Sequence, residues 1–297
     1  MKAIIKSLLL IGCLLVGVNT AAQMNPKRLY TYDFGGLEKM EAGSVVEMLT
    51  ALNYAGIVVG GRGTTKLKRL DTYLALSEKH GKDFEVFAVY MSHSFDKYGF
   101  SDKDHRIAID RIAGKGIDLW IWGKDKNQDG SVTDDKVEDW ISGIVEYAAS
   151  KDVKVVLYSH YGTYFQTTDD VLQMAEKINN PNLGVTVNLS HELRSEKGSF
   201  LKQTFKKSKK YISAIILSGS NIELDKTSNG TRNSSTVKSL ENSEYDLVPF
   251  VKLSKKYGGS LPIGFINFKL SEDPNIYLKN TMDKWIELCN EVGFYEK

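Results

Sequence analysis

Cysteine and proline are scarce in this chain of 297 residues, which contains 2 Cys and 5 Pro and has no apolar run long enough to span a membrane. So few cysteines exclude a disulfide-stapled scaffold, and so few prolines exclude collagen-like and proline-rich disordered proteins. The remaining composition, 42% hydrophobic and 26% charged, is ordinary for a folded protein with a sizeable core.

The first 22 residues have the pattern of a secretory signal peptide. Lys2 and Lys6 precede an apolar run over residues 7–18, and small side chains at 20–22 form a cleavage site before Gln23. The apolar run is too short for a transmembrane helix. The sequence therefore predicts a secreted or periplasmic protein.

Lipidation at Cys13 is the alternative interpretation of this leader, but the chain stays apolar after Cys13, where a lipoprotein normally turns polar. Loss of Lys2 and Lys6 with the signal peptide (residues 1–22) leaves 37 basic against 37 acidic residues in the mature domain, 23–297. A neutral chain has no electrostatic footprint for nucleic acid or for an anionic membrane. We therefore expect neither as a partner.

Eight short apolar runs, rich in β-branched and aromatic residues, alternate with eight amphipathic stretches. Continuous apolar runs are typical of strands buried on both faces, and they cover residues 29–33, 55–59, 84–90, 117–122, 153–158, 183–187, 211–217 and 261–266. The amphipathic stretches predict helices over 43–53, 65–80, 103–113, 133–150, 169–178, 198–209, 246–257 and 274–292. Eight strands alternating with eight helices predict an α/β fold, a single (β/α)₈ TIM barrel. A doubly wound sheet competes, but no Gly-x-Gly-x-x-Gly turn follows the first strand.

Two stretches of this barrel carry a resemblance to a known superfamily. They are Val153-Lys-Val-Val-Leu-Tyr-Ser-His160 and Asn182-Leu-Gly-Val-Thr-Val-Asn-Leu-Ser-His-Glu-Leu193. With the segment 261–285, they resemble the xylose isomerase-like TIM barrels, the sugar phosphate isomerase/epimerase group, in its secreted bacterial branch. The resemblance implies a divalent metal held on the barrel top by carboxylates and histidine, and a proton moved between adjacent carbons of a sugar.

The chain departs from that superfamily at the metal ligands. Tyr158 stands where many relatives have a Glu on strand 5, and Asn188 stands where they have the Asp of Asp-x-x-His. Ile266 replaces the Glu of strand 8, so His191 alone remains of the familiar set. Because Mg²⁺ and Mn²⁺ prefer anionic oxygen ligands, we expect the usual carboxylate–metal route to be weak or absent.

The candidate site residues all follow predicted strands or lie beside those that do. We expect His160, His191 and Glu192 to be catalytic. His160 and His191 would hold a softer ion such as Zn²⁺, or would bond to sugar hydroxyls without a metal. The candidates for substrate binding are Tyr158, Asn188, His93, Asp33, Trp122 and Asn267. Asp33 could equally cap the first helix or pair with a neighbour, and His105, in a charged stretch, is expected at the surface.

A second ion site is suggested by residues 125–136, which match the front of an EF-hand loop. Its candidate calcium ligands are Asp125, Asn127, Asp129 and Ser131. Lys136 occupies the place of the closing Glu, so Asp134, Asp135 or Glu138 would have to supply that carboxylate. A polar turn that caps the next helix is the alternative.

The sequence therefore predicts an exported sugar isomerase or epimerase with a degenerate metal site, acting on a small carbohydrate. The polar loop 219–244, with Glu223, lies on the same face. Aromatic residues near the strand ends favour a sugar as ligand. The alternative function is a carbohydrate-binding barrel that has lost its catalytic chemistry. Glycoside hydrolysis ranks last, since it needs two facing carboxylates.

Overall fold

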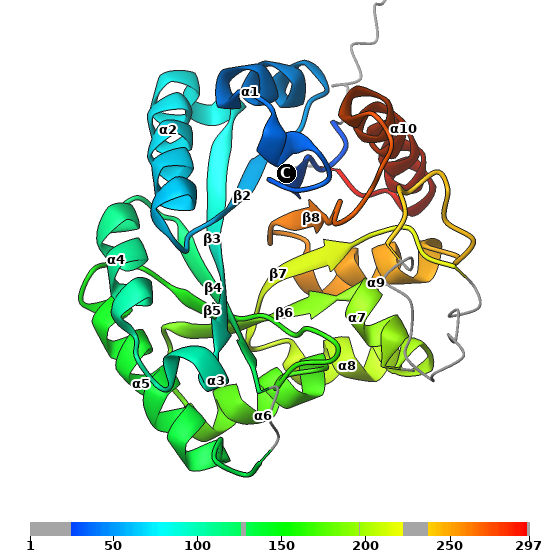
Figure 1. Cartoon of the computed structure of the whole chain (residues 1–297). Coiled ribbons are helices and arrows are strands. Elements are labelled where there is room, and N and C mark those ends of the chain that lie inside the picture. Colours follow the sequence, from blue (N-terminus) through cyan, green and yellow to red (C-terminus); the bar gives the residue numbers. More distant parts are fainter. Residues whose placement is uncertain (1–24, 126–128, 196, 222–236, 296–297) are drawn as a thin grey trace, which may run out of the picture.

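Eight parallel strands close into a barrel, in which each strand pairs with its neighbour in the chain and β8 pairs with β1. The computed structural model describes residues 25–125, 129–195, 197–221 and 237–295. The strands are β1 (Leu29–Tyr32), β2 (Gly56–Gly60), β3 (Glu85–Ser94), β4 (Asp118–Lys124), β5 (Val155–Leu157), β6 (Leu183–Asn188), β7 (Ile212–Leu217) and β8 (Ile263–Phe265). The predicted (β/α)₈ barrel is confirmed, with all eight strands in the predicted places (Figure 1).

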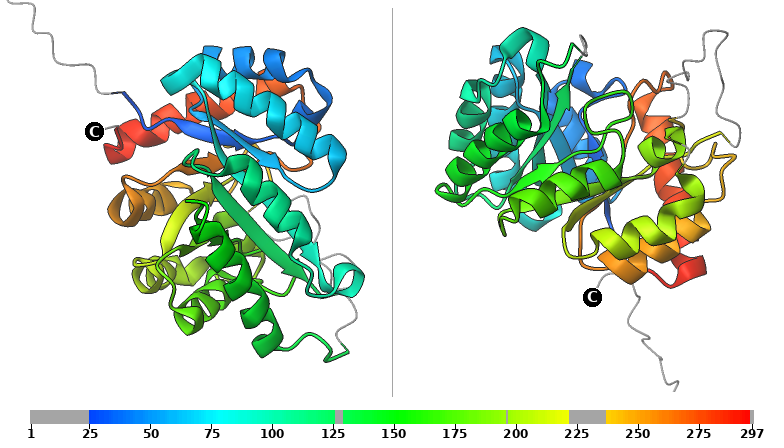
Figure 2. Two further views of the ribbon diagram at one scale, coloured as in Figure 1. Left: turned by 90° about the vertical axis from the view of Figure 1, so that its left-hand side faces the viewer. Right: turned by 90° about the horizontal axis from the view of Figure 1, so that it is seen from below.

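Helices surround the barrel, as the views in Figures 1 and 2 show. They are α1 (Ala42–Ala51), α2 (Thr64–His80), α3 (Phe95–Tyr98), α4 (Lys103–Ile112), α5 (Asp134–Ala149), α6 (Thr168–Ile178), α7 (Leu189–Arg194), α8 (Leu201–Ser208), α9 (Val248–Gly258) and α10 (Pro274–Val292). The eight predicted helices are all present, with ends shifted by a few residues. The short α3 and α7 were not predicted, because four and six residues are too few to show helical periodicity.

Several helix boundaries are set by capping residues. At the start of α6 the Thr167 side chain accepts from the Asp170 amide, and the Asp170 carboxylate accepts from the Thr167 amide, which completes a capping box. The Asp273 side chain caps α10 by accepting from the Asn275 amide. Gly293 ends α10 with φ at 65°, a left-handed conformation that favours glycine.

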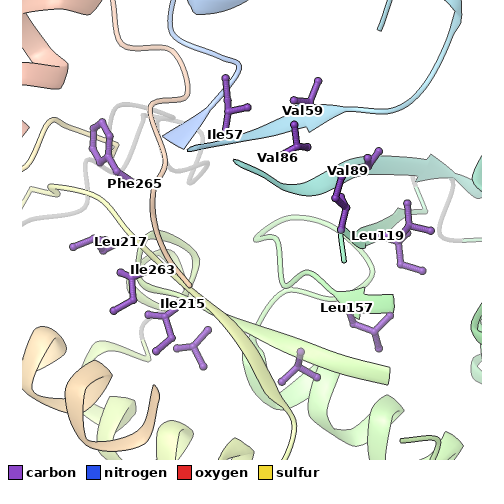
Figure 3. Close-up of a cluster of buried hydrophobic side chains, with 14 of the residues drawn as sticks. Ile57, Val59, Val86, Val89, Leu119, Leu157, Ile215, Leu217, Ile263 and Phe265 are labelled. Atoms are coloured by element: carbon purple, nitrogen blue, oxygen red, sulfur yellow. The ribbon is translucent and has the colours of Figure 1, made fainter. Parts of the chain in front are cut away.

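The main hydrophobic core lies between the strands and the surrounding helices (Figure 3). Strand residues such as Ile57, Leu119, Leu157 and Ile263 are essentially inaccessible to solvent and pack in this layer. Each buried side chain of this size contributes about 1.5–3 kcal/mol relative to exposure. The continuous apolar runs of the sequence reflect this burial, because the other face of each strand is covered as well.

A second, separate core fills the inside of the barrel with aromatic rings. The Tyr30 and Trp120 rings meet edge to face with centroids 5.8 Å apart, and the Tyr90 and Tyr158 rings do so at 4.9 Å. Gly264 of β8 lies directly against the Tyr30 ring and leaves no room for a larger side chain. The ideal Cβ of an alanine at Gly264 would lie 2.0 Å from the Tyr30 ring.

The two faces of the barrel are used differently. One face carries the amino ends of the strands, and there Pro26, just before β1, forms an antiparallel bridge with Tyr295 near the end of the chain. The opposite face carries the carboxyl ends of the strands, which is where TIM barrels build their sites. Among the helices of the described ranges, none is both long enough and apolar enough to cross a bilayer.

The packing of Gly264 against Tyr30 gives a stability prediction. Gly264→Ala should lower the free energy of unfolding by about 1–3 kcal/mol, because the added methyl group forces the buried ring to move. Gly143→Ala is the matched control, since Gly143 lies inside α5 with open space around its Cβ position. That change should raise stability by about 0.5–1 kcal/mol. Urea denaturation of both variants measures the effects, and equal midpoints would contradict the packing described.

Candidate active site

His160 and His191 lie together at the carboxyl ends of β5 and β6, with ring centroids 4.2 Å apart and planes inclined by 37°. His160 follows β5 in a tight turn, where its backbone amide donates to the Phe165 carbonyl at 2.7 Å. His191 comes from α7. The two rings belong to different βα units, so the closed barrel brings together the pair that the sequence predicts.

The position of His191 depends on α7, which begins directly where β6 ends. Leu189 and Leu193, four residues apart on α7, pack into the core between strands and helices. The helical rotation between them turns His191 toward the Tyr158 ring, whose centroid is 6.0 Å away. The Leu189–Leu193 spacing was the one signal in the sequence that could have indicated this helix.

The His160 ring is stacked on Trp122 of β4 at a centroid distance of 4.3 Å and an angle of 8°. Its Nδ1 lies 3.0 Å from the Tyr161 carbonyl oxygen, which can only accept, so Nδ1 carries the hydrogen and Nε2 carries a lone pair. Burial, with a smaller contribution from the cations Lys124 and Arg194, lowers the pKa of His160 to about 4. At neutral pH this imidazole is uncharged, with its Nε2 able to accept a proton.

His191 is 5% exposed, and neither ring nitrogen bonds to any group in the described part of the chain. Burial lowers its pKa well below the ordinary value, and His160 and Arg194 act in the same direction. Buried polar atoms nearly always have a partner, either protein, water or ligand. The His191 ring therefore offers one donor and one acceptor to a bound molecule.

A hydrogen-bonded chain of neutral groups lies beside the histidine pair. The Asn188 amide donates to the Tyr158 hydroxyl at 2.6 Å, and the Ser190 hydroxyl donates to the Asn188 carbonyl oxygen at 3.0 Å. Tyr158 is fully buried, and burial raises the pKa of its hydroxyl. The Tyr158 hydroxyl thus stays protonated at neutral pH. These two positions, where the resemblance implies carboxylates, contribute no negative charge.

Glu192 is buried next to His191 in the chain, but its carboxylate hydrogen-bonds to the first turn of α6. Its Oε1 accepts from the Thr168 amide at 2.6 Å, at the start of α6. Burial raises the pKa of Glu192, and the bond to Thr168 opposes that shift. Within the ranges that the structure describes, no three side chains of His, Cys, Asp or Glu come together as a group able to hold a metal.

Trp122 is 6% exposed, and both His160 and Lys124 lie against its ring, with Lys124 Nζ 4.6 Å from the ring centroid. Little of the ring is therefore open for stacking on a sugar. Its indole Nε1 is buried without a partner among the described groups. The structure thus presents Trp122 as a support for His160 and as a hydrogen-bond donor.

Asp33, a candidate for substrate binding, is bound up in an ion pair. Its carboxylate accepts from Arg69 at 2.5 and 2.8 Å and from the Tyr73 hydroxyl at 3.0 Å. Arg69 also donates to the carbonyl oxygens of Leu37 and Met40. These bonds fasten the loop after β1 to α2, which is the pairing that the sequence left open as an alternative.

Asn267, another candidate for substrate binding, also uses its side chain to hold neighbouring segments together. Its amide donates to the Phe34 carbonyl at 2.8 Å and to the Tyr277 hydroxyl at 2.9 Å. It therefore ties the end of β8 to the loop after β1 and to α10. Asn267 and Asp33 shape the rim of the barrel on the side of β1 and β8.

His93 lies outside the barrel interior, between β3 and the helices. Its Nε2 donates to the Gly99 carbonyl at 2.7 Å, its Nδ1 accepts from Arg62 at 3.3 Å, and its ring packs on Trp140 at 4.4 Å. His105 packs on His93 and is fully buried. The expectation that His105 lies at the surface is wrong, because the apolar face of α4 carries it against Trp140.

The predicted calcium loop is described only in part, since Asn127 lies outside the described residues. Asp129 accepts from the Ser131 amide at 2.9 Å, and Lys136 Nζ donates to the Ser131 carbonyl at 3.0 Å. An ammonium group on that carbonyl disfavours a divalent cation beside it. The calcium site stays a prediction.

The signal peptide and Glu223 also lie outside the described residues. The two ends of the loop 219–244 are held together, because Gly219 and Lys238 exchange backbone hydrogen bonds at 2.9 Å. Ser220 continues this contact by accepting from the amides of Glu244 and Tyr245. The loop thus leaves and returns at one point beside the end of β7.

A pocket of about 460 Å³ opens on the same face, between the loops that follow β1, β2 and β8. Its lining includes Phe34, Gly60, Lys66 and Phe268. The Phe34 ring lies 6.0 Å from Tyr90, and Tyr90 lies 6.1 Å from Trp122 between ring centroids, so ring contacts inside the barrel run from the pocket lining to Trp122, but neither histidine lines the pocket. Sequence reasoning missed this pocket. The glycine pairs 35–36 and 60–61 after two strands were the available signal.

Comparison with known proteins establishes the fold. IolI, in a crystal structure with a binding zinc atom, superposes with a TM-score of 0.68 at 14% identity, over 91% of this chain and 100% of the other. A xylose isomerase-like TIM barrel protein from Mycobacterium smegmatis in complex with magnesium gives 0.63 at 12% identity, over 89% and 97%. D-psicose 3-epimerase with D-tagatose, from Clostridium cellulolyticum H10, gives 0.65 at 9% identity, over 90% and 99%.

No family model matches the chain, and no curated protein matches it. The solved structures nevertheless confirm the resemblance at the level of the fold, which is that of the xylose isomerase-like TIM barrels, including sugar epimerases. Zinc is bound in one of those structures and magnesium in another. A metal is accordingly compatible with the fold.

The buried state of His160 gives a pH prediction. The unfolded chain binds a proton at the ordinary His pKa of 6.5, whereas the folded chain holds the pKa of His160 at about 4. Stability is therefore lost as the pH falls from 6.5 to 4, by about 3 kcal/mol for this group. Between pH 7 and pH 4 the free energy of unfolding of His160→Gln should therefore fall by about 3 kcal/mol less than that of the wild type. Urea denaturation at each pH measures this difference. Identical losses in both proteins would show that His160 is solvated in the folded state.

Proposed function

We propose that this protein binds a small carbohydrate on the carboxyl face of its barrel and acts as an isomerase or epimerase, with His160 as the base. The observation that carries the proposal is the pair of buried, neutral imidazoles, one with a lone pair on Nε2 and the other with both ring nitrogens unused by described groups. A pocket of about 460 Å³ on the same face of the barrel has the size of a small-molecule site, although the loops after β1, β2 and β8 line it and neither histidine does.

The proposed reaction moves a proton beside a carbonyl group. His160 Nε2 takes the proton from the carbon next to the carbonyl, the electron pair of that C–H bond forms a carbon–carbon double bond, and the carbonyl oxygen gains a proton from His191. When His160 returns the proton to the former carbonyl carbon, the hydroxyl on the neighbouring carbon becomes the new carbonyl and gives its proton back to His191, and the product is an isomer. When the first carbon is instead protonated on its opposite face, which His160 reaches only after the enediol turns over in the site, the original carbonyl re-forms, its proton returns to His191, and the product is an epimer. The Tyr158 hydroxyl and the Asn188 amide hold the rim of this site by their own bond.

The described groups do not fit the carboxylate–metal centre that the resemblance implies. Two imidazoles would supply two of the four ligands that Zn²⁺ prefers, and Tyr158 and Asn188 supply no anionic oxygen for Mg²⁺ or Mn²⁺. The proposed reaction therefore includes no step through a metal.

A second function stands beside this one, that of a carbohydrate-binding barrel without catalysis. The specific observation in its favour is the pKa of about 4 at His160, since a base so weak abstracts a proton slowly at neutral pH. The two functions share the ligand class and differ in whether a carbon–hydrogen bond is broken.

Solvent exchange separates these functions. Aldoses and ketoses incubated with the protein in D₂O should gain deuterium beside the carbonyl, and His160→Gln should slow the gain by about 10²–10⁴-fold. His80→Gln, at the end of α2 and away from the site, is the matched control and should react like the wild type. EDTA should leave the rate unchanged. Sugar binding without exchange would favour the binding protein, and neither binding nor exchange would contradict both functions.

We also propose that the protein is exported, on the basis of its first 22 residues. Mature protein from the native host should begin at Gln23, because Thr20 and Ala22 provide the small side chains that signal peptidase requires. Intact-mass and N-terminal peptide spectrometry would measure this. A lipid-modified N-terminus at Cys13 would contradict the proposed cleavage and would indicate a membrane-anchored lipoprotein.

A further inference from the structure

The charge of the mature domain is unevenly distributed along the chain, although its total is zero. The segments 197–221 and 247–271 contain ten lysines and no Asp, Glu or Arg. Ten of the 37 basic residues of the mature domain therefore lie in two segments that hold none of its 37 acidic residues. The neutral total, from which no anionic membrane partner is expected, conceals a local excess of positive charge.

Eight of these ten lysines lie on α8 and α9 or directly after α8. Lys202 and Lys206, four residues apart, share one exposed face of α8. Lys252 and Lys256 are exposed and related in the same way on α9. We define the lysine face as the exposed lysines of this region that have no carboxylate partner among the described residues, which are Lys202, Lys206, Lys209, Lys210, Lys252 and Lys256.

The two helices pack against each other on the outside of the barrel (Figure 2). The Phe205 ring of α8 stacks on the Tyr257 ring of α9 with centroids 5.9 Å apart. Lys256 Nζ lies 5.3 Å from the centroid of that Tyr257 ring, and Lys210 Nζ lies 5.1 Å from the centroid of Tyr211. The lysine face is therefore one surface shared by two helices, with half-buried tyrosine rings at two points along it.

The remaining two lysines of this region are engaged by neighbouring groups. Lys207 pairs with Asp169 of α6 at 3.5 Å, and Lys255 Nζ donates to the Val292 carbonyl at 2.8 Å. Within the part of the chain that the structure describes, no other carboxylate forms an ion pair with a lysine of α8 or α9. The charges of the lysine face repel one another, and an anionic surface laid against them would relieve that repulsion.

The composition of the lysine face favours a lipid surface over a folded protein or a nucleic acid. Protein–protein interfaces are enriched in arginine and depleted in lysine, and arginine is also the commonest reader of DNA bases. The lysine face contains no arginine. Lysine is a point charge on a flexible stem, which suits a diffuse layer of headgroups, and tyrosine is enriched where bilayers meet water.

We infer that the lysine face docks this protein onto an anionic phospholipid bilayer, with α8 and α9 lying along the headgroups. This docking is independent of the proposed function, because the face lies on the outer helices and not at the carboxyl ends of the strands. A lysine near an anionic bilayer raises the affinity about fivefold, so six lysines acting together would raise it about 10⁴-fold.

Vesicle flotation with the chain that begins at Gln23 tests the inference. The leader is omitted because its apolar run would itself enter a bilayer, and every strand and helix of the barrel lies after residue 25. Vesicles of equal parts phosphatidylglycerol and phosphatidylcholine should bind the protein at least tenfold more tightly than vesicles of phosphatidylcholine alone. NaCl at 0.5 M should remove most of that difference, because it shortens the screening length to about 4 Å.

Charge variants assign the binding to the lysine face. Replacing four of its lysines should weaken binding to the anionic vesicles about 10²-fold or more, in the quadruple variant Lys202→Gln, Lys206→Gln, Lys252→Gln, Lys256→Gln. The matched control removes the same charge from exposed lysines on and beside α2 and α4, on the other side of the barrel (Figure 1), as Lys68→Gln, Lys79→Gln, Lys82→Gln, Lys103→Gln. It should bind within about threefold of the wild type, since charges far from the bilayer are screened.

Arginine at the same four positions of the lysine face keeps the charge and should retain the binding, which guards against a variant that fails to fold. Equal binding to both kinds of vesicle, or equal loss in the lysine-face variant and the control, overturns the inference. Duplex DNA at the same phosphate concentration should bind more weakly, because a flat bilayer reaches the lysines of both helices at once. Tighter binding to DNA would assign the face to nucleic acid and would also overturn the inference.

Discussion

The pairing of β1 with β8 is the contact on which the rest of the structure depends, because it closes the sheet into a barrel. Closure removes both sheet edges and encloses an interior that must be filled. Here aromatic rings fill it, and Gly264 on β8 makes room for Tyr30 on β1. The parallel pairing of β4 with β5 and of β5 with β6 places their carboxyl ends side by side on one face, where Trp122, His160 and His191 meet.

The same burial determines the chemistry of the histidine pair. Two imidazoles with centroids 4.2 Å apart would repel each other if both were charged. Burial keeps both neutral, and the nearby cations Lys124 and Arg194 oppose protonation further. Carboxylates, which stabilise cations and metal ions in many TIM-barrel sites, are used here to cap α6 and to hold Arg69.

The rim of the barrel shows how polar residues after strands divide between structure and function. Asp33 follows β1 and His93 lies near the end of β3, and the hydrogen bonds of both are made to neighbouring loops or helices. Asn267 follows β8 and donates to the Phe34 carbonyl and the Tyr277 hydroxyl, although its own carbonyl oxygen has no partner among the described groups. His191 follows a strand too, but its nitrogens are left without partners among the described groups. A residue that follows a strand lies on the carboxyl face of the barrel. Its hydrogen-bond partners in the folded structure then show whether the side chain holds a loop or is left for a ligand.

The sequence by itself determined the alternation of strands and helices and the pairing of His160 with His191 at one end of the barrel. It could do so because strands buried on both faces are continuously apolar, and because parallel strands all end on one face. Only the tertiary structure decided that Glu192 caps α6, that His105 is buried, and that Lys124 and Arg194 flank the site. These outcomes depend on which side chains meet across different βα units, and spacing along the chain does not encode such contacts.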